Sequence, residues 1–215
     1  WFTYTLTDLN GPSETIRHLC WLSRERALSL IPVASLLEGE RTEAIPPQTI
    51  GLPPVWTFTP SFFDSYTLRV PSLLRSLKAI TEACPDEILI STPGPVGLLG
   101  ILASRVLHVP CRAIYHTDFA NQAAYILGDE QMSRGIDDYV RWFYSLCDRV
   151  MVPTREYIGI LGRRGYETGT MSLFRRGIEV DLFTPQPDAH AWLEHEHGVA
   201  PGFTLLYAGR VSKDK

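Results

Sequence analysis

The sequence predicts an α/β fold with a doubly wound parallel sheet, and three observations support that prediction. Apolar segments of strand length alternate with amphipathic segments of helix length along the chain. The first strand is followed by a turn with a glycine, a helix and a second strand, which together form one βαβ unit. Residues 96–107 are apolar nearly all round, as expected of a helix packed deeply against a sheet.

The first βαβ unit is predicted from strand and helix signals together. Residues 1–6 alternate aromatic residues with threonine, which favours a strand. The turn that follows contains Gly11, which is free to take a positive φ angle. Ser13 is a candidate N-cap for a helix over 14–26, and a second strand is expected over 28–35.

The remaining elements continue the alternation. Residues 36–54 are rich in proline, glycine and glutamate, and we expect them to form a surface excursion. The elements predicted after it are a strand over 55–59, a helix over 72–83, a strand over 87–91, a helix over 96–107, a strand over 112–115, an irregular segment, a helix over 132–146, a strand over 149–152, a helix over 154–165 and a strand over 170–174.

The character of the sequence changes towards its end. Thr184-Pro-Gln-Pro187 is typical of a linker, and a short polar helix over 190–198 and a strand over 203–208 follow it. We therefore expect a main domain over 1–184, then a linker and the first strand of a second domain over 185–215. The chain begins inside one predicted strand and stops just after another, so we expect it to be a fragment of a longer protein.

Composition and charge argue against several classes of protein. A net charge of −4 and the lack of a lysine-rich tract argue against a nucleic-acid binder. The four cysteines have no CxxC spacing, so we predict neither a zinc site nor a structural disulfide, and a reducing, cytoplasmic compartment. No apolar run approaches the roughly 18 residues that a membrane-spanning helix needs, and no signal peptide is recognisable.

A polar cluster at one strand end is the main candidate site. The strand over 112–115 ends in His116, Thr117 and Asp118. In open α/β sheets ligands bind at the carboxyl ends of the strands, so these side chains are candidates for catalysis. The alternative is that they only satisfy local hydrogen bonds. Because no GxSxG nucleophile motif accompanies them, serine-hydrolase chemistry is disfavoured.

Two glycine motifs each have a functional and a structural interpretation. Gly11 lies where a phosphate or a sugar could approach backbone amides at a helix start, although a single glycine by itself favours an ordinary βα turn. Gly94, Gly97 and Gly100 could form a dinucleotide loop. We favour close packing of a helix on the sheet there, because two interleaved prolines lack the amide donors that such a loop needs.

Three histidines near the end of the chain resemble metal ligands only superficially. Their spacings do not match a helical i,i+4 pair, and the segment that carries them is otherwise charged. A solvated helix face is the preferred interpretation for His190, His195 and His197.

Six sequence blocks, taken in chain order, carry a resemblance to a known family. The blocks are Thr92-Pro-Gly-Pro-Val-Gly97, Val109-Pro110, Tyr115-His-Thr-Asp-Phe119, Arg149-Val-Met-Val-Pro-Thr154, Arg176-Gly-Ile-Glu-Val-Asp-Leu-Phe183 and Tyr207-Ala-Gly-Arg-Val-Ser-Lys-Asp-Lys215. Together they resemble family 4 retaining glycosyltransferases of the GT-B fold. The His-Thr-Asp block is especially similar to the subgroup that glycosylates membrane lipids, such as diacylglycerol or phosphatidylinositol mannosyltransferases and sulfoquinovosyl lipid synthases.

The resemblance implies a fold and a set of site residues. In such enzymes two Rossmann-like domains face each other across a cleft; the N-terminal one receives the acceptor and the C-terminal one binds the nucleotide-sugar. The resemblance places Gly11 at the donor diphosphate and His116 beside the donor sugar. It places Arg210 and Lys215 on the diphosphate, where two cations stabilise the leaving group without a metal. No Asp-x-Asp motif occurs in the chain.

The chain departs from the family pattern at three points. Asn10-Gly-Pro12 stands where many relatives have a double glycine, and Glu179 stands where the subgroup usually has aspartate. The acidic Glu-x7-Glu pair that grips the donor is absent. We therefore expect this fragment alone to be inactive, and to self-associate through the surface that a second domain would cover.

The predicted function is transfer of a hexose from a UDP- or GDP-sugar to an acceptor hydroxyl, with retention and without a metal or other cofactor. His116 and Asp118 are the candidate catalytic residues. Phe62, Phe63 and Tyr66 are predicted to be lid or core residues, or hydrophobic contacts for the acceptor. A lipid is one candidate acceptor, with peripheral contact at the inner face of a membrane. The alternatives are a sugar-nucleotide epimerase or phosphorylase of the same architecture, and a non-catalytic domain that binds lipid or a partner surface.

Overall fold

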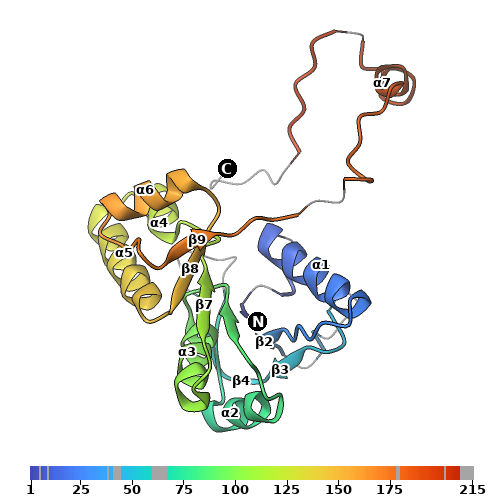
Figure 1. Ribbon diagram of the computed structural model, residues 1–215. Helices are drawn as coiled ribbons and strands as arrows, with labels where there is room; N and C mark the ends of the chain where they lie inside the picture. Colours follow the sequence, from blue (N-terminus) through green and yellow to red (C-terminus); the bar gives the residue numbers. More distant parts are fainter. Residues whose placement is uncertain are drawn as a thin grey trace. The chain divides into compact units, whose positions relative to one another are not determined.

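The computed structural model describes residues 1–4, 6–8, 10–37, 39–40, 45–59, 67–177, 180–200 and 202–208. The chain forms two compact units, Trp1–Phe174 and Arg175–Lys215. The sheet and the predicted strand-end site both belong to the first unit (Figure 1). The assignment of residues 185–215 to the start of a nucleotide-sugar-binding domain stays a prediction.

The main sheet of the first unit is parallel throughout, which confirms the predicted doubly wound, Rossmann-like class. Its strands lie in the order β3-β2-β1-β6-β7-β8-β9. They are β1 (Phe2–Thr3), β2 (Val33–Ser35), β3 (Ile50–Leu52), β6 (Ile88–Ile90), β7 (Cys111–Ile114), β8 (Arg149–Val152) and β9 (Met171–Leu173). The chain runs outward from β1 through β2 to β3, then returns to the other side of β1 with β6. The point where the strand order reverses therefore lies between β1 and β6, where Phe2 is paired with Ile90.

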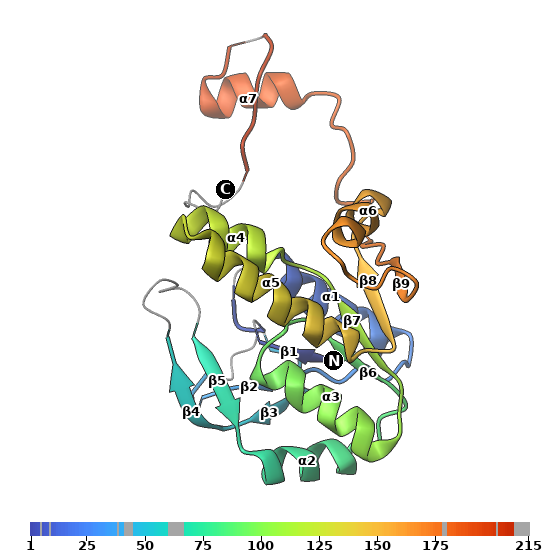
Figure 2. The same ribbon diagram turned by 90° about the vertical axis from the view of Figure 1, so that its left-hand side faces the viewer.

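Helices cover both faces of this sheet. The helices are α1 (Gly11–Glu25), α2 (Leu73–Glu82), α3 (Pro95–Leu107), α4 (Phe119–Leu127), α5 (Glu130–Ser145), α6 (Arg155–Arg163) and, in the second unit, α7 (Ala189–His197). Helices α3 and α5 lie on one face and α1 on the other (Figures 1 and 2). None of the helices in the described ranges is long and apolar enough to cross a membrane.

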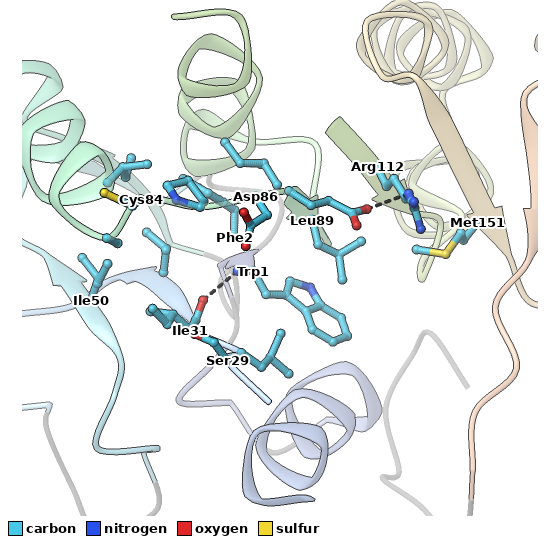
Figure 3. A pocket seen from close by; sticks show the side chains of 17 residues that line it. Trp1, Phe2, Ser29, Ile31, Ile50, Cys84, Asp86, Leu89, Arg112 and Met151 are labelled. Atoms are coloured by element: carbon cyan, nitrogen blue, oxygen red, sulfur yellow. Dashed lines mark hydrogen bonds and ion pairs between the residues drawn. The ribbon is translucent and has the colours of Figure 1, made fainter. Parts of the chain in front are cut away.

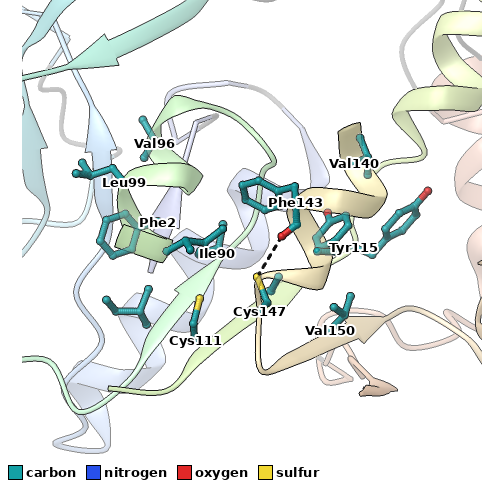
Figure 4. Close-up of a cluster of buried hydrophobic side chains, with 14 of the residues drawn as sticks. Phe2, Ile90, Val96, Leu99, Cys111, Tyr115, Val140, Phe143, Cys147 and Val150 are labelled. Atoms are coloured by element: carbon teal, nitrogen blue, oxygen red, sulfur yellow. Dashed lines mark hydrogen bonds between the residues drawn. The ribbon is translucent and has the colours of Figure 1, made fainter. Parts of the chain in front are cut away.

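The core confirms the predicted close packing of the glycine-rich helix α3 on the sheet. A Cβ added to Gly97 would lie 2.2 Å from the carbonyl oxygen of Thr92, and one added to Gly100 would lie 3.0 Å from the ring of Phe2. Figure 4 shows how the surrounding apolar side chains, among them Ile90 and Phe143, fill the space between this helix, α5 and the strands. Small residues let the α3 backbone approach the sheet, so the glycines serve packing here.

The start of α1 differs from the prediction. Asn10, rather than Ser13, is the N-cap: its Oδ1 accepts hydrogen bonds from the backbone N–H of Ser13 at 2.9 Å and from its hydroxyl at 2.8 Å. The helix therefore begins at Gly11, inside the predicted turn. Pro12 is compatible with this start because the amide that proline lacks has no helical partner in the first turn.

Other elements also differ from the prediction. The expected surface excursion contains strand β3, and β4 (Pro54–Phe58) pairs antiparallel with β5 (Leu68–Pro71) in a separate ribbon. The predicted irregular segment after His116 contains helix α4, whose start is capped by Asp118. Residues 203–208 form no strand, because a strand needs a paired neighbour and no described segment pairs with them.

Candidate active site

The candidate site lies at the carboxyl edge of the sheet, beside the point where the strand order reverses. Four strands end there in residues with polar or aromatic side chains: Tyr4 after β1, Ser91 after β6, Tyr115 and His116 after β7, and Phe174 after β9. Parallel strands bring their carboxyl ends to one edge, so side chains far apart in the sequence meet at this edge.

His116 is half-buried, and Ser91 and Phe174 are among its neighbours. Its Nε2 lies 3.3 Å from Oγ of Ser91, which is buried with 4% of its surface exposed. Its ring packs edge-to-face against Phe174, with 5.9 Å between the ring centroids and an interplanar angle of 88°. On its other side Ser91 accepts a hydrogen bond from the indole N–H of Trp1. The imidazole therefore has a polar neighbour, Ser91, and an aromatic neighbour, Phe174, at the strand end.

Asp118 is held by an ionic network that also caps a helix. Its Oδ1 accepts from the backbone N–H of Asn121, and both carboxylate oxygens accept from Nη1 of Arg164, at 3.0 and 2.8 Å. Arg164 also pairs with Asp137, which accepts the hydroxyl proton of Tyr166 at 2.7 Å. These contacts fix the turn between β7 and α4. The catalytic role predicted for Asp118 stays a prediction.

The network keeps Arg164 charged although the site is partly buried. Burial disfavours the charged guanidinium, but hydrogen bonds to Asp137 and Asp118 outweigh that effect, so the pKa of Arg164 is raised. Burial also raises the pKa of Tyr166, and its hydrogen bond to Asp137 acts in the same direction. Arg164 is thus a permanent cation between two carboxylates, and it ties α6 to α5 and to the turn that carries His116.

Gly11 lies at the start of α1, a short distance along the chain from the end of β1. Within residues 11–14, Pro12 has no amide hydrogen, and the Ser13 and Glu14 amides both bond to Asn10. The Ser13 and Glu14 amides are therefore already used by Asn10. The assignment of Gly11 to a donor diphosphate remains a prediction.

Several predicted site residues lie outside the described residues. They are Phe62, Phe63, Tyr66, Arg210 and Lys215. By contrast, His190, His195 and His197 lie on α7 with exposed side chains, as predicted for a solvated face. In the described part of the chain no cluster of three or more His, Cys, Asp or Glu side chains could hold a metal ion.

Comparison with known proteins gives one sequence relative and a set of similar folds. No protein-family model matches the chain. Over 118 residues it is 30% identical to a GDP-mannose-dependent alpha-mannosyltransferase of Mycobacterium tuberculosis (strain CDC 1551 / Oshkosh). The matched segment covers 55% of this chain and 30% of the mannosyltransferase.

The similar folds are crystal structures of Anabaena Alr3699/HepE. The complex with UDP matches with a TM-score of 0.56 and 13% sequence identity, over 87% of this chain and 47% of the HepE chain. The complex with UDP-glucose matches with a TM-score of 0.53 and 13% identity, over 85% of this chain and 46% of the HepE chain. At this identity the likeness concerns the fold alone. The chain spans less than half of HepE.

Sequence reasoning missed the residues that hold His116. Ser91 follows the neighbouring strand β6, so the strand-end rule that selected His116 could have selected it as well. Trp1 and Phe174 are apolar in type and gave no sequence signal of a role at the site. Their rings contact each other edge-to-face, with 6.3 Å between the centroids, while Trp1 also bonds to Ser91 and Phe174 also contacts His116.

The β4–β5 ribbon is also anchored at this edge, which the sequence did not indicate. The Tyr4 hydroxyl accepts from the backbone N–H of Arg69 and donates to its carbonyl oxygen. Burial raises the pKa of Tyr4 to about 12, so this hydroxyl keeps its proton near neutral pH. The Arg69 guanidinium pairs with both carboxylate oxygens of Glu40 and donates to the carbonyl of Ser35 at 3.0 Å.

A cavity of about 360 Å³ lies at the opposite edge of the sheet (Figure 3). Residues at the amino ends of the strands line it, including Ile50, Ile88 and Arg112. Glu87, which also lines the cavity, forms an ion pair with Arg112 at 2.6 Å. Trp1, whose indole donates to Ser91 at the candidate active site, also lines this cavity, whereas Ser91 and His116 do not.

Proposed function

We propose that this chain is the acceptor-side Rossmann-like domain of a glycosyltransferase that moves a hexose from a GDP- or UDP-sugar to an acceptor hydroxyl. The observation that carries the proposal is the position of His116, a titratable side chain held at a strand end beside the switch point of a Rossmann-like sheet. The similarity to a GDP-mannose-dependent mannosyltransferase supports a GDP-sugar as the donor.

In this proposal the described residues divide into a reacting group and its supports. His116 orients the donor sugar or the oxocarbenium-like transition state, and Asp118 fixes the turn that carries it through Arg164. The Gly11 amide faces the donor diphosphate. Arg210 and Lys215 neutralise the leaving nucleoside diphosphate, so no metal is needed for this step. Retention of the anomeric configuration is part of the proposal through the family resemblance alone.

An apolar acceptor is supported by the exposed aromatic surface of the β4–β5 ribbon. Trp56 and Phe58 stack with 5.7 Å between their ring centroids, and their side chains are 59% and 45% exposed. The chain runs from these rings directly into Phe62, Phe63 and Tyr66, the predicted acceptor contacts. A lipid acceptor at the inner face of a membrane fits this surface, since aromatic side chains favour such interfaces.

The proposal is tested by the His116→Ala variant of the complete protein, assayed with GDP-mannose and UDP-glucose. We expect kcat/KM for sugar transfer to fall by about 10²-fold or more, because a hydrogen bond made at the reacting sugar is lost. The control is His190→Ala, which removes an exposed histidine of α7 and should leave kcat/KM unchanged. Unchanged transfer by His116→Ala would overturn the assignment.

The same assay separates the transferase from its alternatives. Release of nucleoside diphosphate that depends on an added acceptor identifies a transferase. Conversion of the nucleotide-sugar without an acceptor identifies an epimerase. Vesicle binding without either reaction identifies a non-catalytic lipid-binding domain. Measurable transfer by residues 1–215 alone would contradict the proposal that the donor site is shared with a second domain.

A further inference from the structure

Ser91 stands between the ring nitrogens of two other side chains. The indole Nε1 of Trp1 lies 2.5 Å from Ser91 Oγ, and the imidazole Nε2 of His116 lies 3.3 Å from it on the other side. Trp1 is 7% exposed and Ser91 is 4% exposed. The serine backbone is also fixed, since its N–H donates to the carbonyl oxygen of Phe2 at 2.9 Å. Water therefore has little access to the serine hydroxyl.

Counting donors and acceptors assigns a direction to both hydrogen bonds. An indole N–H can only donate, so Trp1 donates to Ser91 Oγ. The serine hydroxyl carries one proton of its own, and among the described residues the acceptor within its reach is Nε2 of His116. Neutral imidazole accepts at one ring nitrogen and carries its proton on the other. Nε2 of His116 is therefore the acceptor, and the proton belongs on Nδ1.

The opposite tautomer is unfavourable in this setting. With the proton on Nε2, the indole N–H of Trp1 and the Nε2–H of His116 would both donate to Ser91 Oγ. The buried serine proton would then lose its acceptor. A buried donor without a partner is costly. The edge-to-face contact with Phe174 holds the imidazole plane, and the Asp118–Arg164 pair fixes the backbone two residues further on.

We propose that Trp1 and Ser91 form a relay that holds neutral His116 in the Nδ1–H tautomer, which makes Ser91 a positioning residue. Any further hydrogen bond that the neutral imidazole donates then comes from Nδ1. The inference rests on the proposed function only in its consequence for catalysis: His116 would serve the sugar as a hydrogen-bond donor rather than as a base.

The tautomer can be measured without any sugar substrate, by long-range ¹H–¹⁵N NMR spectra of the protein labelled with ¹⁵N-histidine. We expect the His116 ring to show a protonated Nδ1 and an unprotonated Nε2 at a pH where it is neutral. A protonated Nε2 in the unmodified protein would overturn the proposal. That outcome would leave the transfer assay, and hence the proposed function, untouched.

Two variants and a matched control test the relay itself. Ser91→Ala removes the proton that Nε2 accepts, so the spectrum should change to a mixture of both tautomers; Ser91→Thr keeps a hydroxyl and should restore the Nδ1–H pattern. The control is Ser104→Ala, which removes another buried serine hydroxyl, one that bonds to the carbonyl of Val109 at 2.8 Å. An unchanged His116 spectrum in folded Ser91→Ala would overturn the relay. If that variant does not fold, the spectrum of the unmodified protein still decides the tautomer.

Discussion

At the scale of single residues, Arg164 connects the candidate site to the stability of the fold. Its guanidinium contacts Asp118 and Asp137, and its side chain is 24% exposed. Removing one partner of a buried ion pair costs more than the pair contributes, because the remaining charges stay buried without compensation. Loss of this cation should therefore destabilise the turn behind His116 as well as the helices it joins.

We expect Arg164→Met to lower the free energy of unfolding by about 2–3 kcal/mol, measured by urea denaturation. The matched control is Arg134→Met. Arg134 is 73% exposed and lies 3.7 Å from Glu130, so its loss should cost less than about 0.5 kcal/mol. Equal effects of the two changes would show that the Arg164 network does not stabilise the fold.

The Glu40–Arg69 pair predicts a dependence of stability on pH. The hydrogen bond from Arg69 holds the pKa of the Glu40 carboxyl below its ordinary value of 4.5. Because the folded-state pKa is the lower one, the pair stabilises the fold above pH 4.5, and this stabilisation is lost as the pH falls through the folded-state pKa.

Glu40→Gln should therefore unfold at a lower urea concentration than the unmodified protein near neutral pH. The difference between the two urea midpoints, here called the gap, should become smaller in acid. Urea denaturation at about pH 7 and about pH 3 measures this gap. Glu130→Gln, a change of a carboxylate that is 91% exposed, serves as the control and should show little gap at either pH. A gap for Glu40→Gln that stays constant with pH would contradict the coupling.

Residue-level prediction from the sequence succeeded where a local rule was sufficient. His116 was found because it directly follows a strand. The partner that Asp118 has in Arg164 is 46 residues away, and no local pattern connects the two. Ser91 was missed because a serine after a strand is common, and its role depends on which strands become neighbours.

At the scale of elements, helix α3 shows how backbone approach limits substitution. We expect Gly97→Ala to lower the free energy of unfolding by about 3 kcal/mol, because the new methyl group would lie 2.2 Å from a backbone oxygen of Thr92. Gly135→Ala in α5 is the opposite case, since nothing lies within 4 Å of its added Cβ. Gly135→Ala should stabilise the protein by about 0.5–1 kcal/mol. Thermal and urea denaturation of the two variants measure these changes. A Gly97→Ala variant as stable as the unmodified protein would contradict the close approach of α3 to the sheet.

Elements were predictable when their own residues determined them. The strand over 149–152 was predicted with the bounds that the structure gives, because its apolar run sits between clear boundaries. Helix α4 was missed, since Asp118 had been interpreted as a site residue rather than as an N-cap. The predicted strand over 203–208 was wrong, because strand propensity forms no strand without a paired neighbour.

At the scale of the whole molecule, alternation of elements and the order of the sequence blocks were enough to predict the fold class. The arrangement of strands was not derivable, because pairing of β1 with β6 depends on the whole sheet. The predicted acceptor contacts and the diphosphate-binding cations remain predictions, since those residues lie outside the described ranges.

The second unit predicts the association behaviour of the chain. Phe203, Leu205 and Leu206 are 94%, 86% and 88% exposed, which is unusual for neighbouring apolar residues. We expect the double change Leu205→Glu and Leu206→Glu to reduce self-association in sedimentation velocity experiments, without changing the unfolding midpoint of the first unit. Unaltered association would show that these side chains do not mediate it.

The parallel sheet also bears on the order in which the protein assembles. Its strands are joined by crossovers, and among the described pairings of the main sheet Phe2 with Ile90 joins the positions most distant along the chain. Closing a long loop costs more entropy than closing a short one. We therefore expect the pairing of Phe2 with Ile90 to form later than the other pairings of the main sheet. The β1–β6 junction is where Trp1, Ser91 and His116 come together. The candidate site should thus form last, and a refolding chain should regain helical signal before it regains the native contacts of His116.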